Sequence, residues 1–126
     1  MGQQQLLLIV LGLIIVAVAI AFSISLFRQA AIDSKRDLIM NENNSLGNLA
    51  IQYYKKAKNM GGGGNSFIGW TLPSDMQTTA SGTHVATVYS DSVVIIGTGN
   101  EVVTGTDSVK ARTTVFPNSM TTVIIN

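Results

Sequence analysis

One stretch constrains this chain more than any other: residues 6–27, with the sequence LLLIVLGLIIVAVAIAFSISLF, contain no charged residue. We call these residues the apolar segment. A helix of this length reaches about 33 Å at a rise of about 1.5 Å per residue, which is enough to cross the hydrocarbon core of a bilayer. The Val and Ile content would also suit strands, but an uninterrupted apolar run this long indicates a helix. The remaining chain is too small to bury it, so the segment must lie in a membrane or against other apolar surfaces.

The flanks of the apolar segment are unusual for a secretory signal. Residues 1–5 contain no Lys or Arg, and no small-residue cleavage site follows the segment, so we expect no cleavage after it. Leu6 stands where a myristoylation motif needs Ser or Thr. The nearby basic residues all follow the segment, and the positive-inside tendency alone would place the rest of the chain in the cytoplasm. These basic residues are Arg28, Lys35 and Arg36.

Length and composition limit what the rest of the chain can be. After the long helix, the 126 residues leave room for one small globular unit. The net charge is +1 and only 12% of the residues are charged, so the footprint that nucleic-acid binding needs is missing. Because there is no cysteine, disulfides and thiolate metal sites are excluded.

Residues 28–60 have the pattern of an amphipathic helix. Hydrophobic side chains recur every seven residues, and Leu49 or Ala50 and Ala57 fill the intermediate positions. The polar residues 41–45, including Asn43, are expected on a solvated face. No proline occurs in residues 1–60, so we predict one helix of about 55 residues that ends at the glycines 61–64. The repeating hydrophobic residues are Ile32, Ile39, Leu46, Tyr53 and Met60.

After the glycines, a period of two and a high Thr, Val and Ile content predict strands. Residues 97–100 are expected to be a connection, and Val102 and Val103 either extend the second strand or begin a short one. The predicted fold is therefore α+β: residues 1–60 form the helix, and residues 61–126 form a head with an antiparallel sheet of about four strands. The amphipathic part of the helix, residues 28–60, covers the apolar face of this sheet. Phe67, Ile68, Trp70 and Leu72 are expected at the seam, and the predicted strands are residues 83–89, 92–96, 108–116 and 121–125.

No pattern in the head indicates catalysis, a cofactor or a metal site. The glycines 61–64 and 97–99 lack the remaining residues of phosphate-binding and dinucleotide-binding motifs, so we interpret them as turns. His84 is the only histidine and is expected to be a half-buried strand residue. Asn43-Asn44-Ser45 fits a glycosylation acceptor, but so short a pattern often occurs by chance, and a solvated helix face is the better interpretation. The acids Asp75, Asp91, Glu101 and Asp107 are expected in turns.

The order of these elements resembles the type IV pilin and pseudopilin family in its mature form. The resemblance covers the layout of the whole chain, but its specific part is residues 1–27. The sequence departs from the family pattern at Gln5, where these proteins usually have Glu. It also has Phe22 at a place near which many members have proline. The cysteine-closed loop of many bacterial members is absent as well. If Met1 is the mature first residue, a basic leader has been removed by a prepilin peptidase. If the cut instead follows Gly2, Leu7 takes the fifth place, and we prefer the first alternative.

The resemblance implies a structural subunit of an extracellular pilus-like filament that assembles by bundling of its N-terminal helices and is not an enzyme. It implies three partners: other copies of the chain, the inner membrane before assembly, and the pilus assembly machinery with its prepilin peptidase; it also implies methylation. Nucleic acid is not an expected partner. Two alternatives remain: a single-pass anchored protein with a small extracytoplasmic β domain, and a type II secretion pseudopilin. The residues expected in the filament core are Met1, Gln5, Leu6, Gly12, Phe22 and Phe27.

Overall fold

The computed structural model describes residues 2–104 and 107–126, and its chain divides into two compact units. The N-terminal unit comprises residues 1–31 and the C-terminal unit residues 32–126. One helix, α1 (Gly2–Lys55), contributes to both units. The predicted single long helix is confirmed, and the lack of proline in this part of the sequence accounts for its continuity. The predicted domain boundary between residues 60 and 61 stays a prediction.

The helix ends five residues before the predicted position, at Lys55 instead of Met60. A short 3₁₀ helix, η1 (Lys58–Met60), follows it, and Met60 is exposed instead of continuing the buried stripe. The reason is that the glycine-rich segment folds back onto the last turn of α1. The N–H of Gly63 donates to the Tyr53 carbonyl at 2.8 Å, and the N–H of Asn65 donates to the Tyr54 carbonyl at 2.8 Å.

The glycine at position 63 is required by this fold-back. A Cβ atom there would collide with the Ser66 carbonyl oxygen and approach the Tyr53 ring. The glycine-rich segment therefore satisfies carbonyls that would otherwise be left without partners at the helix end, as helix C-caps commonly do.

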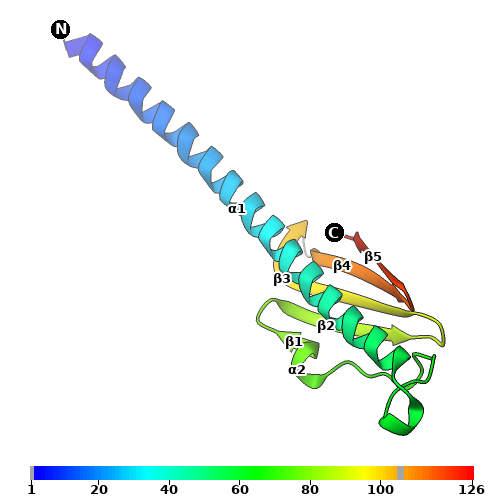
Figure 1. The fold of residues 1–126 in the computed structure, drawn as a ribbon. Helices are drawn as coiled ribbons and strands as arrows, with labels where there is room; N and C mark the ends of the chain where they lie inside the picture. Colours follow the sequence, from blue (N-terminus) through cyan, green and yellow to red (C-terminus); the bar gives the residue numbers. More distant parts are fainter. Residues whose placement is uncertain (1, 105–106) are drawn as a thin grey trace. The chain divides into compact units, whose positions relative to one another are not determined.

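The C-terminal unit contains an antiparallel sheet of five strands in the order β1-β2-β3-β4-β5 (Figure 1). The fold class is thus α+β, as predicted, with one strand more than expected because a two-residue strand precedes the others. A short helix, α2 (Ser74–Gln77), leads into that strand. The strands are β1 (Thr78–Thr79), β2 (Gly82–Val88), β3 (Val93–Thr104), β4 (Asp107–Phe116) and β5 (Ser119–Ile124).

The core of the C-terminal unit lies between one face of α1 and one face of the sheet (Figure 1). Of the two candidates for the intermediate position, Ala50 is buried and Leu49 is exposed. In the connection before α2, Phe67 and Trp70 are buried and Leu72 packs against the core, as predicted, whereas Ile68 is 64% exposed. The main core residues are Leu46 and Ala50 of α1, Phe67 and Trp70 of the connection, and Val93, Ile95 and Val115 of the sheet.

The predicted connection at residues 97–100 is wrong, because these residues lie inside β3. Gly97 and Gly99 are buried on the face that meets α1. A Cβ atom at Gly97 would lie 2.6 Å from the Ile39 side chain and 2.9 Å from Asn43 Oδ1. These glycines therefore allow the helix to approach the strand closely, which is the other common role of glycine in a strand.

The extension of β3 also changes the positions of two acids. Val102 and Val103 extend the second predicted strand after a register shift that begins at Thr98. Glu101 therefore lies in β3 and Asp107 begins β4, and neither lies in a turn. The residues between these two strands, 105–106, are outside the described residues.

Candidate functional site

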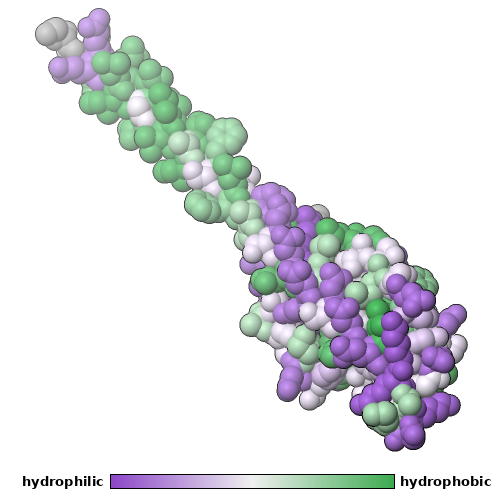
Figure 2. Space-filling view, viewed as in Figure 1, coloured by the Kyte–Doolittle hydropathy of each residue, from purple (hydrophilic) through white to green (hydrophobic). Residues whose placement is uncertain are grey.

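The surface of the apolar segment is the largest uncovered hydrophobic surface among the described residues. Every residue of the segment is exposed in the single chain, and the exposed fraction of its large hydrophobic residues ranges from 50% at Val18 to 76% at Phe27. The visible side of this part of α1 is hydrophobic almost throughout (Figure 2). Among the described residues, α1 alone is long and apolar enough to cross a membrane. A surface this apolar requires lipid or other apolar side chains around it.

The predicted core residues are spread along this surface and do not form a single cluster. Gln5, Leu6, Gly12, Phe22 and Phe27 all lie on α1 and are exposed. Met1, the sixth predicted residue, lies outside the described residues. Their role in a filament is untested and stays a prediction.

The helix is regular through the apolar segment. Phe22, at the place where many pilins have proline, keeps its backbone N–H available for the helix. The Ser23 hydroxyl donates to the Ala19 carbonyl at 2.9 Å, which is a common way for a serine to satisfy itself inside an apolar helix. In the single chain the α-helix is continuous across residues 14–24; we expect it to stay helical through most of residues 6–27 in a filament, which stays a prediction.

Comparisons with protein-family models, with curated proteins and with solved structures find no match for this chain. The function proposed below therefore rests on the residues of this chain.

A buried polar cluster joins α1 to β2. It consists of Glu42 and Asn43 on α1 and His84 on β2. Nδ1 of His84 lies 2.9 Å from Oδ1 of Asn43, and Nε2 lies 2.6 Å from Oε2 of Glu42. The His84 and Asn43 residues are 3% and 0% exposed, so the contact between them is shielded from water, whereas the Glu42 side chain is 23% exposed.

The surrounding hydrogen bonds determine which atoms donate. Nδ2 of Asn43 donates to the Ala111 carbonyl at 3.2 Å, so its Oδ1 is the acceptor for the Nδ1–H of His84. The hydroxyl of Thr79 donates to Oε2 of Glu42 at 3.1 Å. Nε2 of His84 lies within hydrogen-bonding distance of the same carboxylate oxygen. The buried polar cluster thus connects α1, β2 and β4 by directional bonds.

The sequence-based description of these residues was wrong in two respects. Asn43 was expected on a solvated face and is fully buried, and His84 was expected to be half-buried and is 3% exposed. A signal for Asn43 was present, since it lies four residues after Ile39 and three before Leu46, on the buried stripe of the helix. No signal in the sequence pairs Glu42 with a histidine more than forty positions away.

The position of Asn43 also bears on the glycosylation motif. Its amide nitrogen is occupied by the Ala111 carbonyl and has no exposure to solvent. A glycosyltransferase therefore has no access to this side chain in the folded C-terminal unit.

We expect the substitution His84→Ala to destabilise the C-terminal unit strongly. It would leave Oδ1 of Asn43 without its donor and would remove one of the two partners of Glu42, and together such losses cost about 2–4 kcal/mol. The measurement is urea unfolding of the full chain in detergent, followed by the circular dichroism of the sheet. Thr83→Ala is the matched control, because Thr83 is exposed on the same strand and should change the free energy of unfolding by less than about 0.5 kcal/mol. Equal effects of the two substitutions would contradict a structural role for the cluster.

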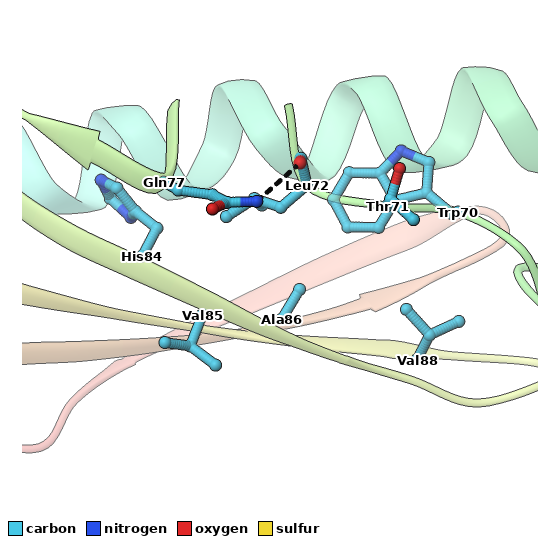
Figure 3. A pocket seen from close by; sticks show the side chains of 8 residues that line it. All are labelled: Trp70, Thr71, Leu72, Gln77, His84, Val85, Ala86 and Val88. Carbon is cyan, nitrogen blue, oxygen red and sulfur yellow. Dashed lines mark hydrogen bonds between the residues drawn. The ribbon is translucent and has the colours of Figure 1, made fainter. Parts of the chain in front are cut away.

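A groove of about 350 Å³ lies beside the buried polar cluster, along β2. Its other wall comes from the connection that contains Trp70 and Leu72, and the side chain of Gln77 lies at one end (Figure 3). Within the described part of the chain, no three of the side chains of His, Asp and Glu are grouped so that they could hold a metal ion. The lining of the groove is mainly apolar, and its polar members are Thr71, Gln77 and His84.

Proposed function

We propose that this chain is the structural subunit of a type IV pilus-like extracellular filament, held in the inner membrane before assembly, and that it acts by helix bundling and not by catalysis. The observation that carries the proposal is the complete exposure of an apolar helical surface over residues 6–27. In a membrane, lipid covers this surface. Outside a membrane, only equally apolar surfaces can replace the lipid, and other copies of the same helix provide them.

The energy of bundling is sufficient to hold such a filament without covalent links. At about 25 cal/mol per Å² of buried apolar area, enclosing a helix of this kind contributes tens of kcal/mol before the entropic costs of association are subtracted. Contacts between different surfaces of successive copies do not close, so they generate an open helical array. The absence of cysteine is compatible with this mode of assembly, because the helix core supplies the cohesion.

The two alternatives also use the apolar helix as a membrane anchor, but they predict a different location for the protein. A filament subunit is the main protein of fibres sheared from the cell surface, whereas an anchored β domain remains with the membrane fraction. A pseudopilin appears in short fibres or in none. The test is electron microscopy of the sheared fraction together with identification of its main protein. If the chain is found only in membranes, the filament proposal is wrong.

We expect Gln5→Leu to leave filament assembly largely intact. In pilins with an acid at this place, the carboxylate is thought to pair with the amino terminus of a neighbour, and an amide cannot form that ion pair. An unsatisfied neutral amide in an apolar bundle costs about 1–3 kcal/mol, against several for an unpaired ion, so the demand for a specific partner is weaker. The yield of sheared filaments measures the effect. Loss of filaments with normal membrane levels of the subunit would show that the amide has a recognition role.

A further inference from the structure

The outer edge of β2 is open along most of its length. β1 pairs only with the first two residues of β2, Gly82 and Thr83. Beyond the end of β1, from Val85 to Val88, no strand in the described residues lies on that side. The Tyr89 N–H donates to the Ser92 carbonyl, which indicates that the odd-numbered residues of β2 face β3. Ala86 and Val88 therefore direct their N–H and C=O groups toward the open edge.

The opposite edge of the sheet is open as well. β5 pairs with β4, and no described strand lies on its other side. The Ile125 N–H donates to the Lys110 carbonyl, so the odd-numbered residues of this strand face β4. Thr122 and Ile124 therefore direct their backbone groups outward.

Neither edge carries the features that usually prevent strands from pairing with other chains. Soluble proteins protect open edges with charged side chains, proline or bulges. The sequences of β2 and β5, GTHVATV and SMTTVI, contain no Lys, Arg, Asp, Glu or Pro. Two unprotected edges on one sheet indicate that each is covered in the working assembly.

The groove beside β2 has the shape and lining for the side chains of an added strand. It runs along Ala86 and Val88, and Trp70 and Leu72 form its far wall (Figure 3). A strand added at this edge would place alternate side chains into the groove. Ile124 lies on the same face of the sheet as Ala86 and is 47% exposed in the single chain, so it is a suitable side chain for this place.

The directions of the strands are also suitable for pairing between copies. Three antiparallel pairings separate β2 from β5, so these two strands run in opposite directions. If two copies have the same orientation, as in a filament whose helices are parallel, β5 of one copy runs antiparallel to β2 of the next. No inversion of a subunit is needed.

We propose that β5 of one subunit adds to the open edge of β2 of the next subunit, so that the sheets form a continuous band along the filament. Ala86 pairs with Ile124 of the neighbour and Val88 with its Thr122, and the Ile124 side chain fills the groove. Val85, Thr87, Thr121 and Val123 lie on the outer face of the joined sheet. This inference rests on the proposed filament, in which the edge contact is repeated at every subunit.

The test uses disulfide cross-linking, which is clean because the chain has no cysteine of its own. In the proposed register, Thr87 lies opposite Val123 of the neighbour in a pair without mutual hydrogen bonds, where Cα atoms are about 4.5 Å apart and within the range that a disulfide spans. The double variant Thr87→Cys, Val123→Cys should therefore give a ladder of dimers, trimers and larger products from oxidised filaments. Reduction should return the ladder to the monomer.

Two controls decide the interpretation. Each single variant should give no ladder, because a chain needs both cysteines to link two neighbours. The pair Thr98→Cys, Thr114→Cys places both cysteines on the outer face of interior strands, away from either edge, and should also give no ladder. Filaments of the double variant without a ladder, or equal ladders from the control pair, would overturn the edge contact while leaving the filament itself established.

Hydrogen exchange of the unmodified chain provides a second measurement. In filaments, the amides of Ala86, Val88, Thr122 and Ile124 should exchange slower by on the order of tenfold or more than in detergent-solubilised monomers. Unchanged exchange at these amides in filaments would overturn the proposal. If the chain forms no filament at all, the proposed function fails first, and the two failures are thereby distinguished.

Discussion

A fragment that begins at Arg28 is expected to be soluble, folded and monomeric, whereas a fragment that begins at Gly64 should aggregate. The longer fragment keeps the C-terminal unit, which begins at Ile32, and omits the apolar segment. The shorter fragment loses Ile39, Leu46 and Ala50, which are all 0% exposed against the sheet. Burial of each large side chain is worth about 1.5–3 kcal/mol, so their loss removes much of the stability of a domain this small.

Circular dichroism and size-exclusion chromatography of the two fragments make this comparison. The longer fragment should elute as a monomer, because the short edge contact between sheets needs the repetition of the filament to be stable. The shorter fragment should show a disordered spectrum or elute in the void volume, since it exposes the uncovered face of the sheet. A folded monomer from the fragment that begins at Gly64 would show that the sheet does not depend on α1.

The elements with regular periodicity could be predicted from the sequence. The apolar segment and the seven-residue repeat predict α1, and a period of two with a high content of Thr, Val and Ile predicts β2, β4 and β5. Such patterns are local, because a helix or strand that buries one face must repeat its apolar residues at the period of its backbone. As a result, the observed ends of β2 and of β5 differ from the predicted ends by only one or two residues.

The errors arise where one residue type has two physical roles. Gly97 and Gly99 have the composition of a turn, but here glycine is needed because Ile39 and Lys35 of α1 approach the strand closely. Which role applies depends on a partner about sixty residues earlier in the chain, and local patterns contain no information about it. Residues 61–64, which have a similar composition, do form a loop because a helix end requires backbone donors there.

The two parts of the candidate site also differ in how far they could be predicted from the sequence. The apolar surface of α1 could be located from the sequence alone, because exposure of an uninterrupted apolar run does not depend on tertiary contacts. The buried polar cluster could not, since Glu42 and His84 meet only when the helix lies on the sheet. The open edges of β2 and β5 likewise become visible only from the strand order.

The substitution Gly12→Phe is expected to prevent filament assembly without affecting the folded monomer. Nothing lies within 4 Å of the place of a Cβ at Gly12, so the single chain has room for a larger side chain. Replacing glycine inside a helix also favours the helix itself, by up to about 1 kcal/mol. In a bundle, however, the small residue is where neighbouring helices approach closely, and a phenyl ring there forces them apart. Overpacking in a close-packed interior costs about 1–3 kcal/mol at each site, and a filament repeats that cost at every subunit.

Leu11→Phe is the matched control, because it introduces the same ring one position away in place of a large side chain and changes the volume little. Both variants should reach normal levels in the membrane and unfold in detergent as the unmodified chain does. Electron microscopy and the yield of sheared filaments should then show loss for Gly12→Phe and near-normal assembly for Leu11→Phe. Normal filaments from Gly12→Phe would mean that the face of α1 that includes position 12 is not a close contact between helices, and the packing of the apolar segment would have to use its other faces.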